Sequence, residues 1–140
     1  MAYWLFQNNP KYYRVMDAIR ECDEMPWLVT RYREKITVGD GVLVWISGKQ
    51  AGIYAIAQVI ESAIVPTEMP DQDYWIDTSR AQGKPHVKIK FLRRLLGQPL
   101  RRRELMQEPV LRDLLVIRAP HSTNFKVTPE QWQRVYDLKG

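Results

Sequence analysis

Apolar residues recur with two different periods along the first part of the chain. Residues 3–7 form a short apolar run typical of a strand, and Asn9 followed by Pro10 provides an N-cap residue with proline at the first helical position. The apolar residues that come next fall on one helical face that ends near Asp23; they are Tyr12, Val15, Met16, Ile19 and Cys22. The pattern predicts a strand followed by an amphipathic helix whose apolar stripe packs in the core.

The next segments predict the main part of a sheet. Residues 27–33 are rich in aromatic and β-branched side chains, and residues 39–41 supply the turn that opens an apolar strand at 42–46. Residues 52–60 form a long partner strand, and the connection at 47–51 has the length and the glycine of a hairpin loop. We expect these last two strands to lie at the centre of the sheet.

Beyond the hairpin, the pattern predicts a long loop and one further strand. Residues 62–85 contain three prolines and a polar cluster, which is typical of an irregular loop, and loops of this length are usually functional or disordered. Trp75 lies in the middle of it, so we expect the loop to fold back over part of the molecule. Residues 87–91 alternate apolar side chains with Lys88 and Lys90, which predicts a strand with one buried face and one basic face.

The last third of the chain predicts helices. Residues 101–106 and 110–115 have helical character, and Thr128 begins an N-cap motif with proline next and glutamine three residues on. That last helix has one apolar face, formed by Trp132, Val135 and Tyr136. Without repeats or linkers, the 140 residues predict a single domain, 1–140, of mixed α/β (α+β) class.

Composition and charge favour an anionic partner. The net charge is +5 and the sequence pI is about 9.4. Clustered cations favour nucleic-acid binding more than a diffuse excess does, and the clustered ones are Lys84, Lys88, Lys90, Arg93, Arg94, Arg101, Arg102 and Arg103. A solvated surface explains the arginine run equally well. The single Cys22 cannot form an internal disulfide, and no run approaches the roughly 20 apolar residues of a membrane span, so we expect a cytoplasmic protein.

The residues that usually carry catalysis are not grouped in this sequence. His86, His121 and Cys22 lie far apart without metal-ligand spacing. The Gly48–Lys49 pair lacks the other glycine and the hydroxyl of a phosphate-binding loop, and no G-x-S-x-G elbow is present. We therefore expect a non-catalytic protein that needs neither a metal nor a cofactor.

Three of the five tryptophans fall where binding sites are usually built. Trp27 begins a predicted strand, Trp45 ends one and Trp75 lies in the long loop, whereas Trp4 and Trp132 occupy core positions. Any one of them is readily explained as core, but three beside basic residues favour a pocket. A nucleobase stacked on such rings gains about 1–3 kcal/mol.

The same segments resemble a known family. Residues 3–10, 27–31, 39–40 and 45–55 look like an EVE domain of the PUA-like superfamily, and residues 128–132 are similar to that family's last helix. The resemblance implies a curved, barrel-like mixed sheet with flanking helices, related to the YTH domains that bind methylated adenine in RNA through an aromatic cage. It also implies binding of a modified base, in DNA rather than RNA, and a restriction or defence protein as partner.

Site residues follow from the resemblance by position. Trp27 corresponds to the first cage wall, and Asn8 and Asn9 stand where a polar residue contacts the edge of the base. The remaining base-binding residues implied are Leu28, Trp45, Ser47, Gly48, Lys49 and Trp75; for Trp75, a loop anchor is an equally good interpretation. The charge pattern, apart from the resemblance, predicts that flanking phosphates are held by the basic residues Lys88, Lys90, Arg101, Arg102 and Arg103.

Two other classes of function fit the same residues. A sensor or enzyme could use the pocket for a free nucleotide or a small aromatic metabolite, and would then show little salt dependence. An interaction module could instead present its basic face to an acidic protein.

Overall fold

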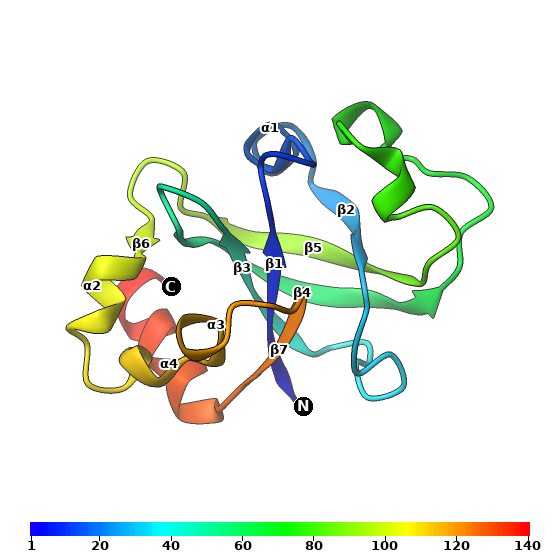
Figure 1. Ribbon diagram of the computed structural model, residues 1–140. Helices are drawn as coiled ribbons and strands as arrows, with labels where there is room; N and C mark the ends of the chain where they lie inside the picture. Colours follow the sequence, from blue (N-terminus) through cyan, green and yellow to red (C-terminus); the bar gives the residue numbers. More distant parts are fainter.

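The computed structural model describes all 140 residues and shows a mixed α+β fold built on a curled, unclosed sheet of seven strands (Figure 1). The strands are β1 (Tyr3–Asn8), β2 (Glu24–Leu28), β3 (Gly41–Ile46), β4 (Gly52–Ile64), β5 (His86–Arg94), β6 (Leu100–Arg101) and β7 (Asn124–Val127). The α-helices are α1 (Val15–Glu21), α2 (Arg102–Met106), α3 (Leu115–Arg118) and α4 (Pro129–Lys139), and short 3-10 turns occur at η1 (Gln72–Tyr74), η2 (Thr78–Arg80) and η3 (Leu111–Asp113).

The strand order across the sheet is β2-β5-β4-β3-β1-β7, with β6 paired to the start of β4. The strands β1 and β3 run parallel, from Tyr3 beside Gly41 to Asn8 beside Ile46. All other pairs are antiparallel. The prediction that β3 and β4 lie inside the sheet is confirmed. The long β4 shifts register three times against β5, and such irregularities bend a sheet.

The two faces of the sheet are covered differently. Because side chains alternate along a strand, β3 directs Val44 and Ile46 to one face and Leu43 and Trp45 to the other. The first face packs on α1 together with Trp27, and we call this the α1-side core. The opposite face packs on α2, α3 and α4, which gather on the other side of the sheet from α1 and the segment 65–85 (Figure 1). None of the helices is long and apolar enough to cross a membrane.

The buried side chain of Asn124 hydrogen-bonds across the gap between the two ends of the curled sheet. Asn124, at the start of β7, is fully buried and reaches the segment that follows β2. Its Oδ1 accepts hydrogen bonds from the backbone N–H of Thr30 at 2.8 Å and of Arg31 at 3.3 Å, and its Nδ2 donates to the carbonyl of Leu28 at 3.2 Å. We call this contact the Asn124 seam; it substitutes for a strand-to-strand ladder between β2 and β7.

Two predicted elements have different boundaries. The helix expected from Pro10 begins only at Val15, because Tyr13 forms an isolated β-bridge with Trp75. The strand expected at 27–33 lies earlier in the chain, since β2 covers Glu24–Leu28 with Pro26 inside it and residues 29–33 form no strand. Proline is tolerated there because β2 is an edge strand.

Towards the C-terminus the predictions are partly confirmed. Residues 110–115 form η3 and the start of α3 rather than one helix, and the four-residue strand β7 was not predicted. The last helix is confirmed with its capping box: the Gln131 N–H donates to Thr128 Oγ1 at 3.1 Å, and the Thr128 N–H donates to Gln131 Oε1 at 3.0 Å.

Candidate functional site

A cavity of about 820 Å³ opens where β1 and β2 end. This volume lies within the range of about 300–1,000 Å³ that is usual for ligand sites. Most of its lining is polar, and the walls come from the ends of β1 and β2, the turn after β3, the segment 75–84 and the residues before β7. The lining residues are Gln7, Asn8, Asn9, Tyr12, Trp27, Leu28, Thr30, Ser47, Gly48, Trp75, Asp77, Ser79, Arg80, Lys84, Pro120, His121, Ser122 and Thr123.

Two indole rings contribute to this cavity in different ways. Trp27 is only 2% exposed and packs on Phe6, with ring centroids 6.1 Å apart, so it offers the cavity a small part of its surface. Trp75 is half-buried and meets Tyr13 edge-on, with centroids 4.6 Å apart and an interplanar angle of 71°. The indole N–H of Trp75 is engaged by Asp71, whereas that of Trp27 has no partner within the protein. Trp27 therefore keeps a donor for a ligand.

Amide side chains lie at the end of β1, on the same cavity. Asn8 Oδ1 accepts from the Asn9 N–H and Asn9 Oδ1 accepts from the Lys11 N–H, both at 2.9 Å. These bonds orient the amides and leave their NH₂ groups as donors. The Ser47 N–H and hydroxyl both donate to the Asn8 carbonyl, at 3.0 and 3.3 Å, which fixes the turn after β3 beside them.

The rim of the cavity carries positive charge from the segment after β4. The guanidinium of Arg80 stacks on the Tyr12 ring, 3.8 Å from its centroid, and Lys84 lies in the same segment. Neither cation forms an ion pair within the protein. Asp77, also on the rim, is engaged by the N–H and hydroxyl of Ser79. An anionic group at the mouth would therefore meet two cations and one carboxylate that already accepts hydrogen bonds.

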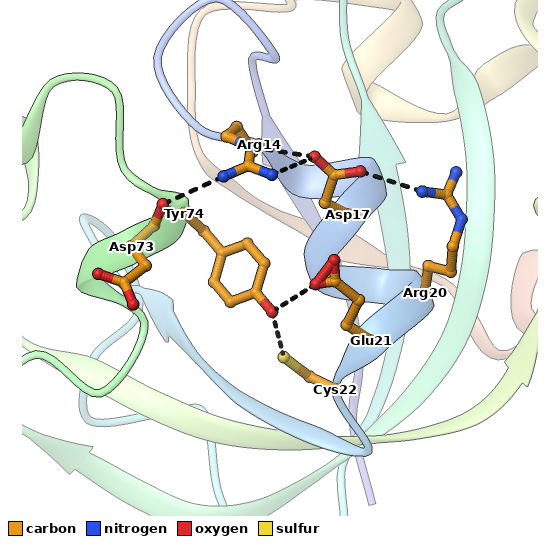
Figure 2. Close-up of polar contacts among 7 residues, drawn as sticks. All are labelled: Arg14, Asp17, Arg20, Glu21, Cys22, Asp73 and Tyr74. Carbon is orange, nitrogen blue, oxygen red and sulfur yellow. Dashed lines mark hydrogen bonds and ion pairs between the residues drawn. The ribbon is translucent and has the colours of Figure 1, made fainter.

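The segment that carries Trp75 is fixed to α1 on its outer side (Figure 2). The Tyr74 hydroxyl donates to Glu21 at 3.0 Å and accepts a weaker bond from the Cys22 thiol at 3.7 Å. Arg14 donates to the Asp73 carbonyl at 3.5 Å. We call these contacts the outer anchor.

Beneath Trp75 lies a buried carboxylate, Asp71. Its Oδ2 accepts hydrogen bonds from the Tyr13 hydroxyl at 2.9 Å and from the Trp75 indole N–H at 3.2 Å. Burial raises the pKa of Asp71 above its usual value, although these bonds favour the ionised form. Burial, with a contribution from Asp71, also raises the pKa of Tyr13. No group of three or more His, Cys, Asp or Glu side chains is arranged to hold a metal ion.

Most base-binding residues named from the sequence meet in the cavity. These are Asn8, Asn9, Trp27, Leu28, Ser47, Gly48 and Trp75. Trp45 does not reach it: alternation along β3 turns this side chain into the core under α2–α4, where it is 2% exposed. Lys49 belongs to the same turn as Gly48 but does not line the cavity either.

The residues named for phosphate binding lie elsewhere. Lys88 forms ion pairs with Glu61 at 2.9 Å and Glu24 at 3.9 Å, and the hydrogen bond to Glu61 raises the pKa of Lys88. The other four, Lys90, Arg101, Arg102 and Arg103, do not line the cavity.

Sequence reasoning missed several lining residues. Arg80 had a usable signal, because it shares the long loop with Trp75, and Lys84 was counted among the clustered cations but not assigned to the site. Ser122 and Thr123 had none: they reach the cavity only because β7 pairs with β1, and the Thr123 carbonyl accepts from the Gln7 N–H at 2.7 Å.

Comparison with known proteins identifies the fold. The model of the EVE domain family matches residues 2–138. A protein from Pseudomonas putida is 24% identical with a TM-score of 0.72, over 98% of this chain and 99% of that one. Human THYN1, solved in complex with DNA containing 5-methylcytosine, is 14% identical with a TM-score of 0.70, over 99% and 97%. The YTH domain of Zygosaccharomyces rouxii MRB1, solved with N6-methyladenosine RNA, is 10% identical with a TM-score of 0.58, over 97% and 86%.

No curated protein sequence matches the chain. At these identities the structural likeness establishes the fold alone, and this is the mixed α+β fold predicted from the sequence.

Proposed function

The chain belongs to the EVE domain family, and we propose that its cavity binds a modified nucleobase carried by a strand of nucleic acid, without catalysis. One observation carries the proposal: two indoles and two oriented amides meet in a cavity of ligand size below a cationic rim. Human THYN1 and the MRB1 YTH domain, which share the fold, were solved with a methylated DNA and a methylated RNA. The higher TM-score of THYN1 leads us to favour DNA.

The chemistry of the lining suits a base rather than an apolar ligand. Stacking on Trp75 contributes about 1–3 kcal/mol per base. The amide NH₂ groups of Asn8 and Asn9 and the indole N–H of Trp27 are donors, and every base edge carries ring nitrogen or carbonyl acceptors. A methyl group adds about 0.8 kcal/mol if it is fully buried. These terms together offset the few kcal/mol needed to flip a base from a duplex.

We expect the phosphates next to the bound base to contact Arg80 and Lys84. These two cations are on the rim and have no acidic partner, whereas Lys88 is already neutralised by Glu61. The run at 101–103 would then act as a more distant basic surface. Replacing Arg80 and Lys84 by alanine should lower the slope of log K against log salt by about 0.9 per lost contact, or about 0.7 on a single strand. Replacing Arg102 and Arg103 should leave the slope within error.

The decisive experiment is a titration of wild type and Trp75→Ala with matched oligonucleotides, DNA and RNA, that are plain or carry 5-methylcytosine or N6-methyladenine. We expect one modified strand to bind at least tenfold more tightly than its plain counterpart, and Trp75→Ala to remove that preference. Trp132→Phe is the matched control, because this ring stacks on Tyr3 on the other side of the sheet. Equal affinity for plain and modified strands would refute the proposal, and tight, salt-independent binding of free nucleosides would favour a small-molecule sensor.

A further inference from the structure

The carboxylate of Asp71 is buried without a cation beside it. Asp71 is only 5% exposed and forms no ion pair with a lysine or an arginine. Buried carboxylates are usually paired with a cation, because an ionised group loses its hydration. A neutral or apolar residue at this position would avoid the loss of hydration. The carboxylate is therefore best explained by the hydrogen bonds that it accepts.

What Asp71 holds is the wall of the cavity. A backbone β-bridge joins Tyr13 to Trp75, with the Arg14 N–H donating to the Tyr74 carbonyl at 2.7 Å and the Ile76 N–H donating to the Tyr12 carbonyl at 2.9 Å. The bridge fixes the main chain of Trp75 but leaves its side-chain torsions free. The indole ring is fixed by its N–H, bonded to Asp71 Oδ2, and by its edge-on contact with Tyr13, whose hydroxyl binds the same oxygen.

The second carboxylate oxygen of Asp71 takes no part in holding Trp75. Oδ1 is buried without a hydrogen-bond partner, and so is Nε2 of His86, a residue that is 3% exposed. The Nδ1 of His86 contacts the Lys84 carbonyl at 2.9 Å, so in the neutral ring Nδ1 carries the proton and Nε2 is an acceptor. Burial lowers the pKa of His86, while the nearby Asp71 acts in the opposite direction. Asp71 and His86 thus influence each other electrostatically without sharing a hydrogen bond, and Oδ2 is the carboxylate oxygen that accepts hydrogen bonds from Tyr13 and Trp75.

We propose that Asp71 is the positioning residue for Trp75, setting the orientation of this indole before the ligand arrives. The inference rests on the proposed function, in which Trp75 stacks on the base. A ring that is already oriented loses less conformational freedom on binding. Hydrogen bonds to an ionised acceptor are also stronger than neutral ones, so one carboxylate oxygen can hold both Tyr13 and Trp75.

Three variants test the proposal by NMR spectroscopy without ligand. The five tryptophans each give an indole N–H signal, and the spectrum of Trp75→Phe identifies the signal of Trp75. In Asp71→Ala we expect the Trp75 signal to shift or broaden while the other four stay in place, and the affinity for the preferred oligonucleotide to fall about 3- to 10-fold. Asp71→Asn keeps an oxygen for both donors and should stay within about twofold of wild type. Tyr74→Phe, which removes the main bond of the outer anchor, is the matched control and should leave the Trp75 signal unchanged.

A second measurement does not depend on whether Asp71→Ala folds. In wild type, the Trp75 indole signal should follow a titration with a midpoint above the ordinary 3.8 of aspartate, and in Asp71→Asn this titration should be absent. The titratable groups that face Asp71 are Tyr13, which stays neutral over this range, and His86.

Three results would overturn the proposal: a Trp75 signal unchanged by Asp71→Ala, an equal effect of Tyr74→Phe, or a Trp75 titration that persists in Asp71→Asn. If wild type binds no modified strand, the proposed function fails by itself, and the ligand-free spectra still decide whether Asp71 positions Trp75.

Discussion

Replacing Asn124 by alanine should destabilise the fold by about 2–4 kcal/mol, because it removes the buried side-chain hydrogen bonds that bridge the seam. The buried amide makes three hydrogen bonds across it, to Leu28, Thr30 and Arg31. A buried polar group left without its partner costs about 1–3 kcal/mol. The side chains of Thr30 and Arg31 are exposed, so their amides can regain water after a small movement, which limits the total. Domains of this kind are stable by about 5–15 kcal/mol, so the loss is a large fraction.

The change in the free energy of unfolding is measured by urea denaturation of wild type and Asn124→Ala. Ser122→Ala is the matched control, since it removes one hydrogen bond beside the seam, from Oγ to the Asn124 carbonyl, and should cost about 1 kcal/mol or less. Hydrogen exchange adds a local measurement. The Thr30 amide should exchange faster in Asn124→Ala, whereas the protection of amides in β3 and β4 should fall only as much as the lower global stability requires. A loss below about 1 kcal/mol with unchanged Thr30 protection would refute the reasoning.

Three further predictions concern other parts of the fold. Burial alone would raise the pKa of Asp40, but hydrogen bonds from Thr37, Trp4 and Ala2 hold it below 3.8. The ionised Asp40 therefore contributes its full stabilisation above pH 3.8 and loses it as the pH falls through the lowered pKa. Asp40→Asn should accordingly weaken the decrease in the free energy of unfolding at acid pH. Burial lowers the pKa of His86 below 6.5, so stability should fall as pH drops from 6.5 towards the lowered value, and His86→Leu should remove this slope in urea unfolding at several pH values. Gly41→Ala would place a Cβ 2.6 Å from the Trp132 ring and should lower the free energy of unfolding by about 1–3 kcal/mol. Adding Trp132→Leu in the same chain should recover part of this loss. If the effects of the two substitutions simply add, this contact is not the cause.

Local sequence signals were sufficient for the elements whose stability is local. The alternation at 87–91, the turn at 39–41 and the capping box after Thr128 each depend on neighbours within a few residues, and all three are present in the structure. The helix expected from Pro10 is shorter because Tyr13 pairs with Trp75, 62 residues away along the chain. A partner at that distance leaves no local pattern.

The candidate site was predictable only in part for the same reason. Asn8 and Trp27 were named through the family resemblance, by their positions along the chain, and both line the cavity. Trp45 was included because it ends a strand, yet the two-residue period already places it on the opposite face from Ile46. Asp71 belongs to the polar cluster of the 62–85 loop and has no local signal of its own, since its burial depends on the contacts with Tyr13 and Trp75.

Pro26, in the middle of edge strand β2, bears on how copies of this protein behave at high concentration. An exposed edge strand offers unpaired N–H and C=O groups to any incoming strand, and joining of such edges is a common start of aggregation. Proline has no N–H, and on an edge strand the missing donor faces outward. The exposed carboxylate of Glu24 lies on the same short strand. An incoming strand could therefore not form a continuous ladder along β2, which leaves this side of the sheet open to solvent at little risk of self-association.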